Sequence, residues 1–131
     1  MKAVPQPRPA ILVIESDKAT RSGMQSLLEK YGYRVSVAVH EKAAAISASQ
    51  QKFDLILFDS GLAPPESLVA AYKLTQQPEL NNVPMMVMSV HSNFSVPLDS
   101  PDIDNFTVAY LSNISRFDEL EKLIRCLMSE S

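Results

Sequence analysis

The sequence has few of the residues on which several classes of protein depend. It contains one cysteine, Cys126, so it cannot form an intramolecular disulfide, and Cys126 falls in a helical pattern where we interpret it as a packing residue. Its three glycines leave no glycine-rich loop for a phosphate, which weighs against a flavodoxin-like enzyme or nucleotide binder. The two histidines, His40 and His91, provide no nucleophile, base and orienter set, although His91 either lines a crevice or lies in an exposed loop.

A basic excess and long apolar runs are also missing. The net charge is −3 and the twelve Lys and Arg residues are scattered, whereas a nucleic-acid surface needs a clustered basic face. The uninterrupted apolar runs are far shorter than the ~20 residues that cross a bilayer. With no charged-then-apolar leader before the first strand, we expect a cytoplasmic protein that contacts neither membrane nor nucleic acid.

What is present is enough for one globular domain. At 131 residues, 46% hydrophobic and 21% charged, the chain can bury one core and is too short for two ordinary domains. Residues 1–9 carry three prolines at alternate positions, a pattern that blocks regular hydrogen bonding and favours a flexible, extended arm. We therefore place the domain at residues 10–131.

The most informative stretch is Lys52–Pro65, KFDLILFDSGLAPP, in which an apolar run stops at Asp59. The length of this run and its β-branched and aromatic content predict a strand buried on both faces. Asp59 then lies at the carboxyl end of a strand, where ligands collect in open α/β sheets. An aspartate in this position is also a common turn former or helix cap, so the rest of the chain has to decide its role.

Apolar spacing predicts alternating strands and helices along the chain. Strands are expected at residues 10–14, 33–39, 55–59, 83–90 and 107–111, and helices after Asp17, at 41–51, at 66–77 and after Ser115. Asp17 is placed to cap the first helix, Gly32 to end it, and Met24, Leu27, Leu28 and Tyr31 to share its buried face. Alternation through Val35, Val37 and Val39 is typical of a strand near a sheet edge. This order predicts an α/β fold with helices on both faces of a parallel sheet.

Polar residues follow four of these strands and point into one crevice: Glu15, Ser16, Asp59, Ser89 and Asn113. Together with the segments ILVIESD with Arg21, FDLILFDSGL, VPMMVMS and YLSN, they make residues 10–128 resemble the receiver domain of bacterial two-component response regulators. The resemblance implies a three-layer, flavodoxin-like fold with a five-stranded parallel sheet in the order 2-1-3-4-5. The prolines at 97 and 101 predict that the fourth helix is short or replaced by a loop.

Receiver domains accept a phosphoryl group from a histidine kinase on the aspartate after the third strand, with the help of a divalent metal. The resemblance implies that Asp59 is the phosphoacceptor and that Ser89 and Tyr110 form the switch that follows phosphorylation. It also implies that Glu15, Asp59 and the backbone carbonyl of Gly61 hold the metal.

The sequence departs from the family pattern at a metal-binding carboxylate, at a lysine and proline after the fifth strand, and at a proline four residues after the phosphoacceptor. The residues found there are Ser16, Asn113 with Ile114, and Ala63. In addition, Glu15 is one methylene longer than the usual aspartate. Losing a carboxylate weakens magnesium binding, and losing the lysine removes a cation that neutralises phosphoryl oxygens. Because one charge of each sign is lost, the pocket keeps its formal charge, and Asn113 could hydrogen-bond Asp59 directly.

Two functional hypotheses follow from this comparison. The first is a degenerate receiver, or pseudo-receiver, which is not an enzyme and signals through protein–protein contacts without ordinary magnesium-dependent phosphorylation. The second is a phosphorylatable receiver, with weak magnesium binding, in which Asp59, Ser89 and Tyr110 still act as the switch. No other cofactor is expected. The partner is a histidine kinase or a downstream effector, and the domain is a monomer or a weak homodimer.

The segment after the fourth predicted strand contains apolar residues among acids, namely Phe94, Val96, Leu98 and Ile103. One interpretation is that they anchor a signalling partner, because in the family the neighbouring face carries partner binding. The other is that they fold back onto the sheet.

Overall fold

In the computed structural model of the chain, the residues described are 8–61, 66–88, 110–111, 122 and 124–125. The predicted arm lies almost entirely outside them, as do the apolar segment after the fourth strand and most of the residues predicted to form the last helix. None of the helices within the described ranges is long and apolar enough to span a membrane.

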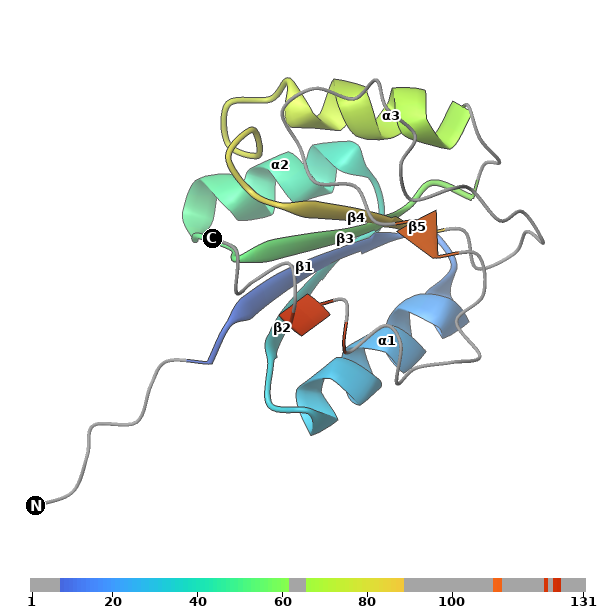
Figure 1. Ribbon diagram of the computed structural model, residues 1–131, viewed down its shortest axis with the longest axis vertical. Coiled ribbons are helices and arrows are strands. Elements are labelled where there is room, and N and C mark those ends of the chain that lie inside the picture. Colours follow the sequence, from blue (N-terminus) through green and yellow to red (C-terminus); the bar gives the residue numbers. More distant parts are fainter. Residues whose placement is uncertain (1–7, 62–65, 89–109, 112–121, 123, 126–131) are drawn as a thin grey trace, which may run out of the picture.

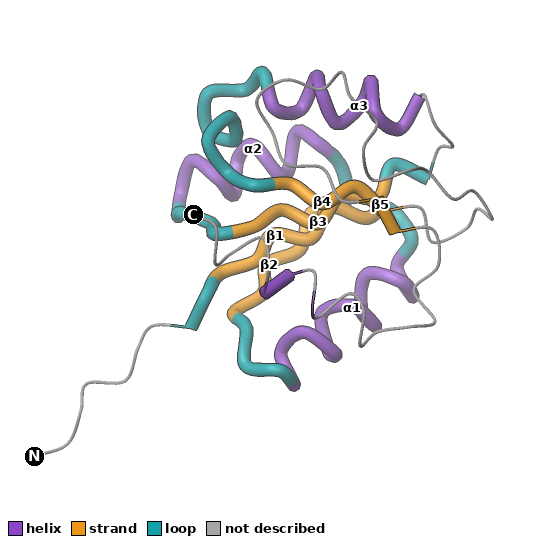
Figure 2. Tube along the Cα trace, viewed as in Figure 1, coloured by secondary structure: helices purple, strands orange, loops and turns teal. Residues whose placement is uncertain are grey.

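The sheet consists of parallel strands in the order β2-β1-β3-β4-β5 (Figure 1). The strands are β1 (Ala10–Glu15), β2 (Arg34–Ala38), β3 (Leu55–Asp59), β4 (Met85–Met88) and β5 (Tyr110–Leu111). The first four confirm the predicted parallel order, and β2 is the edge strand that the valine alternation indicates. The loops after β1 and β3 leave the sheet at the same edge (Figure 2).

Helices cover both faces of this sheet, as predicted. Helix α1 (Lys18–Lys30) packs on one face, and α2 (Glu41–Gln50) and α3 (Glu66–Thr75) lie on the other (Figure 1). Lys122, Ile124 and Arg125 are helical as well, and Ile124 joins the core on the α1 side.

Two apolar clusters hold the layers together, one on each face of the sheet. Because side chains alternate along a strand, β1 and β3 contribute to both. Leu12 and Phe58 point to the α2 and α3 side, where Leu74 is also buried, whereas Val13 and Leu57 point to the α1 side. All apolar residues of β1 and β3 are at most 3% exposed, which confirms that β3 is a strand buried on both faces.

Helix starts follow the capping chemistry of the sequence. Asp17 caps α1 as predicted, since its side chain accepts a hydrogen bond from the backbone N–H of Thr20. His40 caps α2, where its Nδ1 accepts from the N–H of Ala43 at 3.1 Å. Gly32, just past the end of α1, has φ of 95°, the left-handed conformation expected of a terminating glycine.

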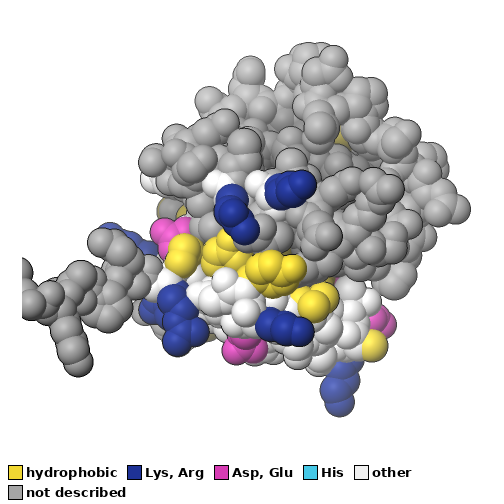
Figure 3. Space-filling view, turned by 60° about the horizontal axis from the view of Figure 1, so that its bottom comes forward, with side chains coloured by type: hydrophobic (Ala, Val, Ile, Leu, Met, Phe, Trp, Pro, Cys, Tyr) yellow, Lys and Arg dark blue, Asp and Glu magenta, His cyan; other side chains and the backbone are white. Residues whose placement is uncertain are grey.

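The prediction is wrong about three apolar residues, which are exposed to solvent. Leu27 and Tyr31 on α1 are 40% and 46% exposed, because the buried stripe is centred on Met24 and Leu28. On this side of the molecule hydrophobic side chains reach the surface among Lys and Arg residues (Figure 3). Val39 is 48% exposed, since β2 ends at Ala38 and the chain turns towards the cap of α2.

Helix α3 is also shorter than the predicted 66–77 and ends at Thr75. The N–H groups of Gln76 and Gln77 each bond to a carbonyl three residues earlier, on Lys73 and Leu74. This tightening of the last turn is typical of a helix end, and Pro78 blocks any continuation.

Candidate functional site

Two carboxylates lie side by side at the carboxyl edge of the sheet. Glu15 is the last residue of β1 and Asp59 the last of β3, and the parallel register pairs them directly. Neighbouring strands are about 4.8 Å apart, so the two residues border the same small volume. Glu15 is 2% exposed and Asp59 is 4% exposed. The structure therefore brings together the two acids that the sequence predicted to share a crevice.

The turn after β3 fixes one oxygen of Asp59. Its Oδ1 accepts a hydrogen bond of 2.8 Å from the backbone N–H of Gly61. Gly61 has φ of 74°, a conformation that residues with a side chain rarely adopt, so glycine suits this turn. The bond orients the carboxylate of Asp59 relative to the loop that follows it.

The turn after β1 contains a third acid, but its side chain is used elsewhere. The Oδ2 atom of Asp17 accepts hydrogen bonds from the N–H of Thr20 at 2.9 Å and from its Oγ1 at 2.7 Å. The backbone N–H of Asp17 donates to Oε2 of Glu15 at 3.2 Å. Ser16, between them, is exposed. The Asp17 carboxylate thus serves α1, while its backbone helps to hold Glu15.

Arg21 is a part of this site whose contacts the sequence did not predict. Its Nη1 donates to the carbonyl of Glu15 at 2.9 Å and lies 3.3 Å from the carbonyl of Ser16. The signal that could have found them is spacing, because Arg21 stands one helical turn after the cap residue Asp17. Arg21 thereby brings a permanent positive charge to the end of β1.

Carboxylate and carbonyl oxygens are ligands that suit magnesium, which binds proteins through one or two carboxylates and keeps several waters. Within the described residues no group of three or more His, Cys, Asp or Glu side chains could hold a metal ion. The pair of Glu15 and Asp59, with the Gly61 carbonyl nearby, fits a weakly held magnesium ion.

Several predicted residues lie outside the described part of the chain: Ser89, Asn113, Phe94, Val96, Leu98 and Ile103. His91 and Cys126 lie outside it too. Tyr110 is described only as backbone, in β5, where it pairs with Val87. The switch pair and the partner surface therefore remain predictions.

Comparison with known proteins agrees with this geometry. Residues 11–124 match the family described as the response regulator receiver domain. The transcriptional regulatory protein ZraR of Klebsiella oxytoca is 27% identical over 127 residues, which are 92% of this chain and 28% of that protein. ZraR of Escherichia coli is 27% identical over 112 residues, which are 85% of this chain and 24% of that protein. The chain thus spans about a quarter of the length of these relatives.

Solved structures show the same fold at low identity. The chemotaxis protein CheY4 of Vibrio cholerae superposes with a TM-score of 0.71 at 15% identity, covering 92% of this chain and 99% of that one. The receiver domain of a Pseudomonas aeruginosa sensor histidine kinase was solved with magnesium in its active-site cleft. It superposes with a TM-score of 0.69 at 21% identity, covering 94% of this chain and 99% of that one. The match over 114 residues, the strand order and the paired acids at the sheet edge agree, and the chain belongs to the response regulator receiver domain family.

Proposed function

We propose that this receiver domain is a pseudo-receiver, which signals through protein–protein contacts and is not switched by ordinary magnesium-dependent phosphorylation of Asp59. The family is a signalling module of two-component systems rather than a classical enzyme, and its members interact with histidine kinases. The partner of this chain is accordingly a histidine kinase or a downstream effector. Its docking surface is proposed on the segment that contains Phe94, Val96, Leu98 and Ile103.

One observation carries this proposal: Asp17, one of the two acids that flank Ser16, is already engaged. Ser16 stands where the family has a metal ligand, and the adjacent Asp17 directs its Oδ2 to Thr20 at the start of α1. Turning Asp17 towards a metal would remove this cap, at a cost of about 1 kcal/mol. Asp17 is therefore a poor replacement for the carboxylate that Ser16 lacks.

Arg21 supports the same conclusion. Its guanidinium lies 2.9 Å from the carbonyl of Glu15, at the end of the strand that carries one of the two remaining acids. A fixed positive charge here offsets part of the negative charge that would attract a metal cation. The contacts to two successive carbonyls also hold the turn after β1 in one conformation.

The alternative is a phosphorylatable receiver in which Asp59 accepts the phosphoryl group and Ser89 and Tyr110 respond. The pairing of Glu15 with Asp59 favours this alternative, because it preserves the centre of the site. Glu15, Asp59 and the Gly61 carbonyl would then hold magnesium, which would neutralise the phosphoryl oxygens. Asp59, oriented by the Gly61 N–H, would present its carboxylate to the incoming group.

An amide NMR titration with magnesium, and then with magnesium plus beryllofluoride, separates the two. A pseudo-receiver gives no saturating shifts at Asp59 and Gly61 at low millimolar metal, and no further response to the phosphoryl mimic. Shifts that converge on Asp59, Ser89 and Tyr110 would instead establish the phosphorylatable receiver. The matched control is Asp59→Asn, which must abolish any response that depends on the site.

A further inference from the structure

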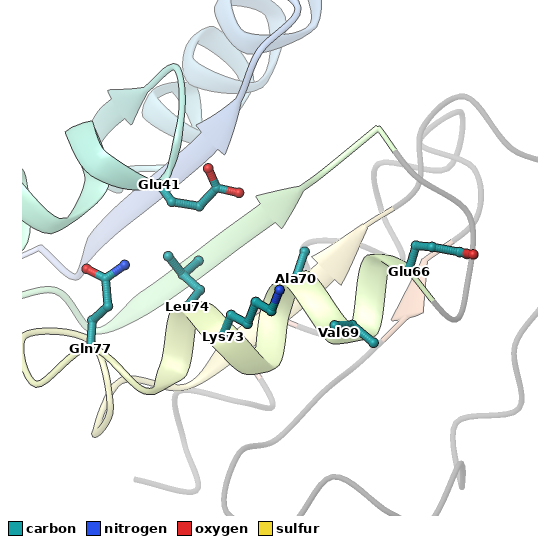
Figure 4. A pocket seen from close by; sticks show the side chains of 7 residues that line it. All are labelled: Glu41, Glu66, Val69, Ala70, Lys73, Leu74 and Gln77. Carbon is teal, nitrogen blue, oxygen red and sulfur yellow. The ribbon is translucent and has the colours of Figure 1, made fainter.

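Outside the site, the described surface contains a groove of about 390 Å³ along α3 (Figure 4). Its apolar lining is Val69, Ala70 and Leu74, and its polar lining is Glu41, Glu66, Lys73 and Gln77. Val69 is 52% exposed and can contact another molecule. Glu41 belongs to the first turn of α2, so the groove runs between the two helices that cover this face of the sheet.

Four of the lining residues form one stripe along α3. Glu66, Val69, Ala70 and Lys73 have the i, i+3, i+4, i+7 spacing that places side chains on one side of a helix. Glu66 and Lys73 are two turns apart, about 10 Å along the helix axis. We call these four residues the α3 stripe. An acid stands at its first end, a base at its second end, and two small apolar residues lie between them.

The charged side chains of this stripe have no ion-pair partner in the part of the chain that the structure describes. Among the described residues, neither Glu66 nor Lys73 takes part in an ion pair, and Glu41 takes part in none either. Two opposite charges on one helix face, seven residues apart, are too far apart to bind each other directly. The stripe therefore presents one acidic and one basic side chain that another molecule can pair with.

We propose that this molecule is a second copy of the same chain, packed with its α3 antiparallel to the first across a two-fold axis between Val69 and Ala70. Such an axis places each residue of one copy opposite the residue of the other copy that is equally far from the point between Val69 and Ala70. Glu66 of one copy therefore faces Lys73 of the other. Two reciprocal ion pairs then flank a centre of Val69 and Ala70. Glu41 lines the same groove and adds a second carboxylate to it.

Symmetry favours a second copy over an unrelated partner. A two-fold interface has to be complementary to itself, and a stripe with opposite charges at equal distances from an apolar midpoint meets that requirement. The small residues at the midpoint allow two helices to approach closely. A contact based on one short helix is smaller than the ~1,200–2,000 Å² of stable interfaces, so the dimer is weak and rapidly exchanging. This inference goes beyond the proposed function, because no part of it involves Asp59 or a metal.

Sedimentation velocity of the full chain, from micromolar to millimolar concentration, tests the proposal. The wild type shifts towards the dimer as concentration rises. Lys73→Glu and Glu66→Lys each place like charges opposite one another twice, which weakens association by about tenfold or more. The double variant Glu66→Lys/Lys73→Glu restores both pairs with exchanged signs and recovers association. Lys18→Glu is the control for Lys73→Glu, because it changes net charge by the same amount but lies on α1, across the sheet.

A wild type that stays monomeric at millimolar concentration would overturn the inference. So would a dimer that both single reversals leave unchanged, or one that the double variant fails to restore. Circular dichroism of each variant separates a lost contact from a lost fold. Because association is measured without magnesium or beryllofluoride, its outcome is independent of the test of the pseudo-receiver proposal.

Discussion

Ser16 and Asp17 are neighbours in the chain, but only one of them is committed to the fold. Asp17 uses its carboxylate to bind Thr20 at the start of α1 and its backbone N–H to bind Glu15. Ser16 is exposed, and its hydroxyl cannot replace an anionic metal ligand. Metal binding at the carboxyl edge of the sheet therefore depends on whether residue 16 or residue 17 carries the carboxylate.

The cap predicts a measurable loss of stability in Asp17→Ala. Removing the side chain leaves an N–H group at the start of α1 without its acceptor, which costs about 1 kcal/mol of unfolding free energy. Asp17→Ser keeps an acceptor at the same position and should remain close to the wild type. Urea denaturation of the three proteins measures both values. Equal losses in the two variants would contradict a capping role.

Two glycines give a matched pair for the turn after β3. A Cβ atom added at either Gly23 or Gly61 meets nothing within 4 Å, so neither substitution creates a clash. Gly61 has φ of 74°, and Gly61→Ala should therefore lower stability by about 1–2 kcal/mol. Gly23 lies inside α1, where alanine is the better helix former, and Gly23→Ala should raise stability by about 0.5–1 kcal/mol. Urea denaturation measures the change in unfolding free energy of both variants. If both variants gain stability, or both lose it, this account of the two glycines is wrong.

At the scale of elements, α1 depends on a narrow buried stripe. Leu28 is 0% exposed in the cluster on the α1 face, whereas its neighbour Leu27 is 40% exposed. Leu28→Ala should cost about 2–5 kcal/mol, because a fully packed side chain leaves a cavity. Leu27→Ala should cost less than about 1 kcal/mol, since solvent already reaches its side chain. Thermal unfolding of both variants compares the two losses of stability. Similar losses would show that α1 does not pack through the stripe of Met24 and Leu28.

The elements themselves were largely predictable, and their edges were not. A run such as Leu55–Phe58 is apolar at every position and short, which is typical of a strand covered on both faces. Periodicity also found α1, but it could not tell that Leu27 and Tyr31 lie at the margin of the stripe. That margin depends on how the helix is rotated on the sheet, which is a property of tertiary packing. The end of α3 likewise depends on which carbonyls its last N–H groups reach.

At the scale of the molecule, topology predicts which strand ends meet, and it does so without any knowledge of side-chain conformation. Parallel strands bring their carboxyl ends to one edge, so Glu15 and Asp59 were expected together and are paired in register. The contacts of Arg21 with two carbonyls were not predicted, because spacing places Arg21 only one turn after Asp17, and the contacts also depend on the path of the turn after β1. The sequence thus predicted that these two acids meet, and the structure supplied the hydrogen bonds around them.

If two substitutions disabled an ancestral receiver site, reversing them should restore its chemistry in this fold. Ser16→Asp adds a hard anionic ligand beside Glu15 and should tighten magnesium binding by about tenfold or more, which corresponds to roughly 1.4 kcal/mol. Ser16→Asp alone should not create a strong response to beryllofluoride, since the lysine that neutralises phosphoryl oxygens in the family is still missing at position 113. Ser16→Asp/Asn113→Lys supplies both and should respond at Asp59 to the phosphoryl mimic, as measured by amide NMR.

The two changes should be more than additive, because a metal and a lysine neutralise different oxygens of one phosphoryl group. The control is the same pair in an Asp59→Asn background, which keeps the added charges but removes the acceptor and should give no response to beryllofluoride. If the double variant binds magnesium and still ignores the mimic, the block lies at another departure from the family pattern, such as Ala63 in place of the family's proline. If wild type and double variant respond alike, the two substitutions never disabled the site, and the domain is a working receiver.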